Sequence, residues 1–183
     1  MTAAGSVSGR ERLRLFCALR LPGDVARDLA AWQHTQLRDG RIVPPEHLHL
    51  TLAFLGSRPW EEVDAIGREL GAAAAAAGPI QLEPARYRET RSVGMLVLDD
   101  AGGAASALAG DLHERLQRLG VYELEKRRWL PHVTVLRFRR PPRLAPPVPA
   151  LGAFGPSDAA LYHSVLRSTG AQYEALESFA LGG

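Results

Sequence analysis

The sequence predicts a fold of the α/β or α+β class, with helices packed on the outer faces of its sheets. Three observations predict it. Apolar strand-like runs alternate with helix-like segments along most of the chain, which favours layers of sheet and helix. The last two strand-like runs are joined by the short stretch 168–170, as in a hairpin. A four-residue pattern occurs twice, each time in a strand-like run, which predicts two similar lobes.

The first half of the chain is predicted to contain two strands and two helices. Residues 13–22 are typical of a buried strand that ends at a proline. Residues 23–40 are predicted to form a helix, with Asp24 as its N-cap and Gly40 just past its end. Residues 47–55 form the second predicted strand. Residues 58–79 form the second predicted helix, which has Pro59 near its start and a Gly-Pro stop.

The second half is predicted to be richer in strands. Residues 80–89 and 92–100 are expected to pair, and residues 103–120 to form a third helix that ends at Gly120. Residues 127–138 are typical of another strand. The proline-rich residues 139–156 are expected to form a loop with at most one edge strand, and residues 158–167 and 171–181 a closing hairpin. We expect residues 1–10 to be a disordered lead and residues 11–183 a single bilobal domain.

Composition limits the class of protein. The chain has 183 residues, 46 % of them hydrophobic and 23 % charged, which suits a globular domain. It contains neither an apolar run of membrane-spanning length nor a secretory leader, so we expect a cytoplasmic protein without a membrane partner. Cys17 is the only cysteine, which excludes an internal disulfide and a Cys-x-x-Cys metal site. No protein partner is indicated, and a monomer is expected.

The basic residues are almost all arginine. Lys126 is the only lysine among 22 basic residues, although the net charge is only +2. Two explanations remain open: a coding bias that also enriches alanine, glycine and proline, or phosphate binding by guanidinium groups. The arginines form two clusters, of which the second brackets the second motif: Arg86, Arg88 and Arg91; and Arg127, Arg128, Arg137, Arg139, Arg140 and Arg143. Such clusters predict either an electropositive rim that attracts phosphate groups or a solvated loop face.

The repeated pattern is His, an aliphatic residue, Thr, and another aliphatic residue. It occurs as His49-Leu50-Thr51-Leu52 and again, 83 residues later, from His132 to Val135. Alternate side chains of a strand point to the same face, so each histidine shares a face with its threonine while the aliphatic residues are buried. Two similar lobes would bring these polar faces together across one cleft.

Two imidazoles and two hydroxyls on one cleft suit phosphodiester chemistry. One imidazole can act as a general base and the other as a general acid, while the threonine hydroxyls bind the oxygens of an anion. Neither motif contains a carboxylate or thiolate, so no metal site is expected. The opposing interpretation treats His49 and His132 as ordinary strand histidines and Thr51 and Thr134 as examples of β-propensity; the repetition argues against it.

Other candidate residues leave alternatives open. His47 would share the face of His49 if the strand were already regular there, as a third imidazole or a metal ligand; otherwise it lies at the strand entrance. His34 and His113 are predicted to be surface residues, and His163 to lie near the cleft. We expect Arg137 to contact phosphate, since one strand face after Thr134 would aim it at the cleft. Four aromatic residues could stack on a base or belong to the core: Phe16, Tyr87, Trp129 and Tyr173.

With these residues in place, the chain resembles the two-histidine (2H) phosphoesterases, and most closely their branch of RNA 2′,3′-cyclic phosphodiesterases, also called 2′-5′ RNA ligases. The resemblance covers nearly the whole chain: "RLFCALRLP" is similar to the opening strand, "VPPEHLHLTLAFLG" and "PHVTVLR" to the two motifs, and "LYHSVLRSTGAQYEAL" to the closing hairpin. Two positions depart from that branch. His47 stands where Asn is expected, and the run "SVGMLVLDD" lacks an expected tryptophan.

The resemblance implies a fold and a mechanism. The fold is an α+β, bilobal one, with two pseudo-symmetric, mainly antiparallel sheets flanking a central cleft and helices outside. The mechanism needs no metal or cofactor: His49 donates a proton to the leaving oxygen, and His132 activates water. Thr51, Thr134 and Arg137 bind the phosphate.

The resemblance also implies a substrate class. The expected substrates are RNA with a 2′,3′-cyclic phosphate end or small cyclic nucleotides, hydrolysed to 2′-phosphates, with 2′-5′ RNA ligation as the companion activity. The alternative is a non-catalytic module that binds RNA ends in the same pocket.

Overall fold

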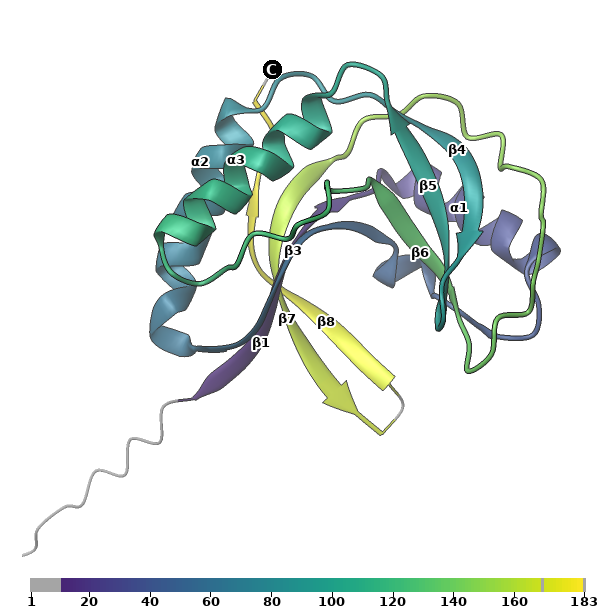
Figure 1. The fold of residues 1–183 in the computed structure, drawn as a ribbon, viewed down its shortest axis with the longest axis horizontal. Helices are drawn as coiled ribbons and strands as arrows, with labels where there is room; N and C mark the ends of the chain where they lie inside the picture. Colours follow the sequence, from purple (N-terminus) through teal and green to yellow (C-terminus); the bar gives the residue numbers. More distant parts are fainter. Residues whose placement is uncertain (1–10, 169, 183) are drawn as a thin grey trace, which may run out of the picture.

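The computed structural model describes residues 11–168 and 170–182 and contains two curved antiparallel sheets of four strands each (Figure 1). The predicted disordered lead, residues 1–10, lies outside the described residues. Three helices lie on the outer sides of the sheets. The structure confirms the predicted α+β class and its bilobal arrangement.

The first sheet is built from both ends of the chain. Its order is β3-β1-β7-β8, and its strands span Arg12–Arg20 (β1), His49–Pro59 (β3), Asp158–Arg167 (β7) and Gly170–Phe179 (β8). The helices α2 (Val63–Ala76) and α3 (Ala104–Arg118) cover its outer face (Figure 1). A Cβ placed on Gly71 would lie 2.9 Å from the ring of Phe179, so glycine allows α2 to approach β8 closely.

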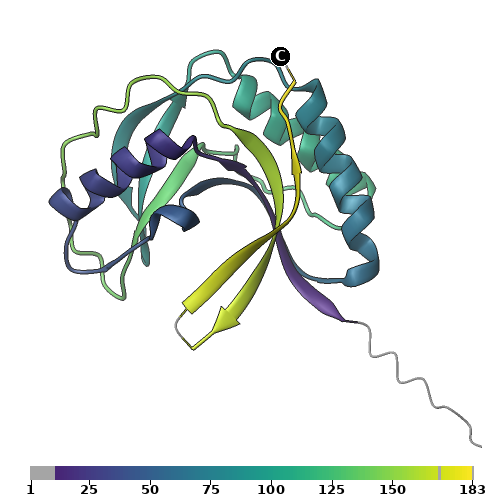
Figure 2. The same ribbon diagram turned by 180° about the vertical axis from the view of Figure 1, so that it is seen from behind.

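The second sheet has the order β2-β6-β5-β4. Its strands span Arg41–Ile42 (β2), Leu82–Glu89 (β4), Val93–Asp100 (β5) and His132–Arg137 (β6). Helix α1 (Gly23–Gln36) lies against this lobe, as the view from behind shows (Figure 2). The buried Gln33 side chain ties α1 to the sheet, since its Nε2 donates to the carbonyls of Val43 and Val135 at 3.0 and 2.7 Å.

Helix α1 begins at Gly23, the first residue of the predicted segment, but it ends earlier than predicted and has a different N-cap. Pro22, and not Asp24, occupies the N-cap position, and no side chain caps the helix. The fixed φ of proline places the start of the helix at the next residue, and Asp24 then lies in the first turn, where its charge complements the helix dipole. The helix ends at Gln36, because Leu37 adopts an extended conformation and is buried.

The segment before the first motif is also less regular than predicted. Residues Pro45–His47 form a 3₁₀ turn (η1), and β3 begins only at His49. A second 3₁₀ turn, Trp60–Glu62 (η2), precedes α2. Strand β6 is shorter than the predicted run 127–138, and the two-residue strand β2 was not predicted. Both differences arise because pairing depends on the partner strand: Arg41 and Ile42 pair with the end of β6.

One hydrophobic core connects the two lobes. It includes side chains from β1, β3, β5 and β6, among them Leu15, Leu50, Leu96 and Val133, each at most 1 % exposed. Each motif strand therefore anchors one face in the core. Among the described residues, no helix combines the length and hydropathy needed to span a membrane.

Candidate active site

The two motifs begin two strands that face each other across the lobes. His49 is the first residue of β3 and His132 the first of β6, and these strands of different sheets lie against each other. The Nε1–H of Trp129 donates to the carbonyl of Thr51 at 3.0 Å and so links the approach to β6 directly to β3. Two motifs 83 residues apart in sequence are thereby brought next to each other.

Each motif histidine is held by the backbone two residues before it. His49 Nδ1 lies 2.8 Å from the carbonyl oxygen of His47, and His132 Nδ1 lies 2.7 Å from that of Leu130. A carbonyl oxygen only accepts hydrogen bonds, so Nδ1 carries the proton in both rings. In the neutral form of each ring, Nε2 is then the basic nitrogen that is available for proton transfer.

The two threonines share faces with their histidines, and one of them contacts its histidine directly. His49 Nε2 lies 3.1 Å from the Thr51 hydroxyl, which donates to it when the ring is neutral. Between the polar residues, Leu50 and Val133 are buried. The alternation in both motifs places the imidazole and the hydroxyl on the strand face opposite the buried aliphatic residues.

Aromatic rings enclose His49. Its ring centroid lies 5.0 Å from that of Phe16, 5.4 Å from that of Tyr173 and 6.2 Å from that of Tyr162. Burial lowers the pKa of His49 to about 4; the hydrogen bond to the His47 carbonyl opposes this shift, and the charges of His47, Arg137 and His132 add to it. His47, Arg137 and His132 therefore lie close enough to His49 to act on it electrostatically.

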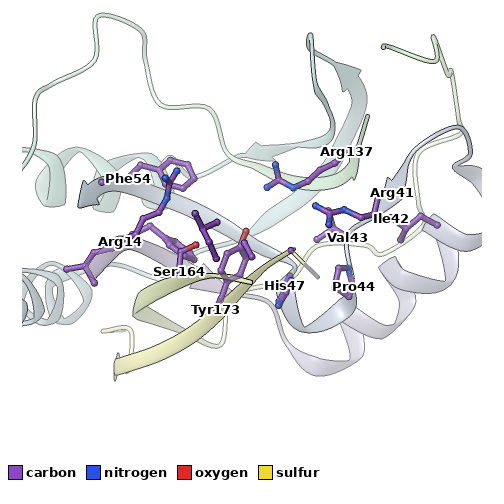
Figure 3. Close-up of a pocket in the computed structure, with 16 residues that line it drawn as sticks. Arg14, Arg41, Ile42, Val43, Pro44, His47, Phe54, Arg137, Ser164 and Tyr173 are labelled. Atoms are coloured by element: carbon purple, nitrogen blue, oxygen red, sulfur yellow. The ribbon is translucent and has the colours of Figure 1, made fainter. Parts of the chain in front are cut away.

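A cavity of about 730 Å³ opens beside the aromatic rings that pack against His49. Its walls include Arg14 and Phe16 from β1, Arg41 from β2, Arg137 from β6 and Tyr173 from β8. Figure 3 shows the guanidinium groups of Arg41 and Arg137 reaching in from one side and Arg14 from the other. Neither motif histidine lines the cavity itself. Phe16 and Tyr173 connect the cavity with His49, because both rings line the cavity and also pack against the His49 ring.

The structure separates the predicted candidates into groups. Arg137 lines the cavity and acts electrostatically on His49. His47 lies in the turn η1 rather than in the strand, with its ring 4.6 Å from that of Tyr173 at the cavity wall. His163 was expected near the cleft. Its neighbour in β7, Ser164, lines the cavity. Successive side chains of a strand point to opposite faces, so His163 points away from the cavity.

His34 and His113 also differ from each other. His34 is exposed, as predicted. The prediction that His113 is a surface residue is wrong: it is partly buried, its Nε2 lies 2.7 Å from the carbonyl oxygen of Leu52, and its ring stacks on Tyr122. The helical spacing of α3 gives no signal for such a contact, since it depends on a distant strand.

The aromatic candidates also divide. Phe16 and Tyr173 adjoin His49, whereas the Trp129 side chain is bonded to β3. Tyr87 packs near Trp32 of α1, and its hydroxyl donates to Glu89. These roles follow from tertiary contacts and not from residue type.

Sequence reasoning missed four residues near the site, namely Arg14, Arg41, Phe54 and Tyr162. The sequence does contain a signal for Arg14. In β1, Arg14 and Phe16 alternate with Leu13 and Leu15, which are buried. That alternation places Arg14 on the same face as Phe16. For Arg41 and Phe54 we find no comparable signal, because their positions depend on β2 and on irregular pairing of β3 with β1.

The side chains of the cleft do not form a metal cage. Within residues 11–168 and 170–182, no group of three or more histidine, cysteine, aspartate or glutamate side chains is arranged to hold a metal ion. His47 and His49, which the sequence left open as joint ligands, are not part of such a group. The metal-free mechanism itself stays a prediction for experiment.

The fold and its relatives place the chain in the class of two-histidine phosphoesterases. The chain belongs to the 2′-5′ RNA ligase superfamily, whose family profile matches residues 21–170. It is 34 % identical to the RNA 2′,3′-cyclic phosphodiesterase of Thermus thermophilus, over 93 % of this chain and 91 % of that protein. It is 28 % identical to the Escherichia coli protein of the same name, over 93 % and 98 %.

Solved structures agree with this assignment. E. coli LigT complexed with 3′-AMP superposes with a TM-score of 0.80 and 25 % identity, covering 94 % of this chain and all of LigT. A crystal structure from T. thermophilus gives a TM-score of 0.79 and 31 % identity, covering 93 % of this chain and 99 % of that one. The similarity therefore extends over both lobes and the cleft between them.

Proposed function

We propose that this protein hydrolyses 2′,3′-cyclic phosphates, at the end of an RNA or on a nucleoside, to 2′-phosphates. The observation that carries the proposal is the pair of imidazoles, each with Nδ1 bonded to a carbonyl and Nε2 available for proton transfer. The related proteins from T. thermophilus and E. coli carry the name RNA 2′,3′-cyclic phosphodiesterase. LigT has also been crystallised with 3′-AMP and with phosphate, ligands that resemble a nucleotide product and its charged group.

In this mechanism His132 Nε2 takes a proton from water, and the resulting hydroxide attacks phosphorus. The bond from phosphorus to the 3′-oxygen breaks, and His49 Nε2–H donates its proton to that oxygen, which leaves a 3′-hydroxyl and a 2′-phosphate. Thr51 and Thr134 donate hydrogen bonds to the non-bridging oxygens, and Arg137 offsets their charge. If a ribose 5′-hydroxyl took the place of water as the nucleophile, the same displacement of the 3′-oxygen would form a 2′-5′ linkage, which is 2′-5′ ligation.

The low pKa of His49 has a consequence for its role as acid. With a pKa of about 4, His49 is neutral at pH 7 in the free protein, and it must gain a proton in the complex. A phosphodiester anion beside Nε2 favours the imidazolium and raises its pKa. We therefore expect inorganic phosphate or a 2′-nucleotide to raise the pKa of His49, measured by NMR titration of the ring resonances. An unchanged pKa at saturating ligand would contradict its role as acid.

The pH dependence of kcat tests the pair as a unit. One imidazole must be neutral and the other protonated, so a bell-shaped profile is expected, with apparent pKa values that belong to the pair. In the substrate complex the acid limb belongs to His132 and the basic limb to His49. Replacing either residue should flatten its own limb in the remaining activity. A flat wild-type profile, with chemistry shown to limit the rate, would exclude the two-histidine mechanism.

The second candidate function, a non-catalytic RNA-end-binding module, predicts binding without turnover. The basic cavity beside the cleft is the observation that favours it. Incubation with a 2′,3′-cyclic mononucleotide and analysis of the products separates the two functions: a 2′-phosphate supports the enzyme, and recovered substrate supports the module. The same assay in EDTA tests the metal-free mechanism. Activity that is lost on chelation and restored by one metal ion would overturn it.

A further inference from the structure

The cavity beside His49 carries more positive charge than one phosphate needs. Arg14, Arg41 and Arg137 line it, and no carboxylate is among its lining residues. None of the three arginines has a carboxylate oxygen within 4 Å in the described ranges 11–168 and 170–182. Apolar walls strengthen the field of such charges, so the cavity favours a ligand with more than one anionic group.

A second, shallow hollow continues from this cavity. Its lining includes Arg41 and Arg137, which also line the first cavity, followed by Arg139 and Arg140, with Asp39 as the one acidic residue. The shared pair joins the two hollows into a basic track that leads away from the motif histidines. Only Arg137 of this track is needed for the phosphate at the reacting centre.

Arg41 and Arg137 are held side by side by the backbone. They are directly paired across β2 and β6, and Figure 3 shows their side chains extending toward the same space. Arg41 also reaches across to the other lobe, since a Cβ placed on Gly170 would lie 2.8 Å from its Nη1. Like charges directly opposite each other on paired strands are destabilising, and anions bound between or beside them would offset that cost.

From this arrangement we infer that Arg41 forms a second phosphate subsite, which binds the phosphate on the 5′ side of the nucleoside that carries the cyclic phosphate. The inference rests on the proposed function and specifies its substrate. Because the track continues past Arg41 to Arg139 and Arg140, the source of that phosphate is the backbone of an oligoribonucleotide. The protein then acts on RNA ends in preference to cyclic mononucleotides.

Three substrates test the subsite: a 2′,3′-cyclic mononucleotide with a 5′-hydroxyl, the same mononucleotide with a 5′-phosphate, and a trinucleotide that ends in a cyclic phosphate. For the wild type we expect kcat/KM to rise from the first to the second and again to the third. Arg41→Gln should lower the ratio of kcat/KM for the trinucleotide over the first substrate about tenfold or more, since a charge-assisted contact is lost. Arg68→Gln, on the exposed outer face of α2, is the matched control. It should change neither the kcat/KM for the trinucleotide nor that for the mononucleotide with a 5′-hydroxyl.

The salt dependence gives an independent measurement. Each phosphate contact with single-stranded nucleic acid contributes about −0.7 to the slope of log K against log salt, so Arg41→Gln should make the slope for trinucleotide binding shallower by about that amount. A ratio and slope equal to those of the wild type would overturn the inference. If the 5′-phosphorylated mononucleotide reached the trinucleotide value, the subsite would serve small nucleotides, and RNA would be the wrong source.

Failure of the proposed function would be recognised separately. It would show as no product from any of the three substrates with the wild type. The subsite is then tested by binding alone. Fluorescence anisotropy measures the affinity for a trinucleotide and for a mononucleotide, both of which end in a 2′-phosphate. Arg41→Gln should weaken the trinucleotide about tenfold relative to the mononucleotide, and equal effects on both ligands would contradict the subsite.

Discussion

His49 and His132 each begin a strand, and each bonds its Nδ1 to the carbonyl two residues earlier, yet their surroundings differ. Phe16, Tyr162 and Tyr173 surround His49, whereas within the described residues no aromatic ring packs against His132. The repeated motif therefore sets the same tautomer twice. The difference between the proton donor and the base must come from the walls around each ring, and burial against aromatic rings is what lowers the pKa of His49.

The largest effect should come from removing either imidazole. His49→Ala and His132→Ala should each lower kcat on a cyclic mononucleotide by about 10²–10⁴-fold, the usual contribution of a general acid or base. Circular dichroism and thermal unfolding should show that both variants fold. His34→Ala, at an exposed position of α1, is the control and should keep wild-type activity. If either motif variant retained most of its kcat, the acid–base assignment would be wrong.

Replacing Thr51 and replacing Thr134 should have different effects on the pH profile, although the two residues occupy equivalent motif positions. Thr51→Ala and Thr134→Ala should each lower kcat/KM by about 10²-fold, because each removes a donor to the phosphate oxygens. Thr51 also lies 3.1 Å from His49 Nε2, so its loss should additionally shift the basic limb of the kcat profile. Thr51→Ser, which keeps the hydroxyl, should restore both. Equal pH profiles for the two alanine variants would contradict the proposed functional difference between the two motifs.

Burial of His49 should make stability depend on pH. Its folded pKa of about 4 lies below the ordinary value near 6.5, so the unfolded chain binds more protons between these values. Stability from this source is present above about pH 6.5 and is lost as the pH falls toward 4, by about 3 kcal/mol in total. Urea unfolding of wild type and His49→Gln from pH 7 to pH 4 measures it.

The difference in unfolding free energy between the two proteins should shrink or reverse as the pH falls, because glutamine does not titrate. His34→Gln, at an exposed position, should run parallel to the wild type. A pH-independent difference between wild type and His49→Gln would show that His49 titrates normally in the folded protein.

Strand alternation predicted the polar faces of both motifs, because His49 and Thr51 needed only the period of a strand to share one face. It left open whether His47 belongs to the strand or lies at its entrance, and the turn η1, which also packs against α1, decides for the entrance. It could not find Arg41, which acquires its place only through two residues paired with β6. Local periodicity thus predicts which side chains share a face, and tertiary pairing decides which faces meet.

The smallest effect should come from His47, whose imidazole lies near that of His49 but outside both motifs. His49 is held by the backbone carbonyl of His47 and not by its ring, so His47→Ala leaves that bond in place. The ring lines the cavity against Tyr173, and its charge adds to the lowering of the pKa of His49. For His47→Ala we expect kcat to fall less than tenfold, and a larger change, where there is one, should be in KM. His47→Asn introduces the residue that the family resemblance predicts there, and its kcat and KM should stay near those of the wild type. Steady-state kinetics of both variants beside His49→Ala decides the matter: a loss in His47→Ala as deep as that in His49→Ala would show that the chemistry had been assigned to the wrong histidine.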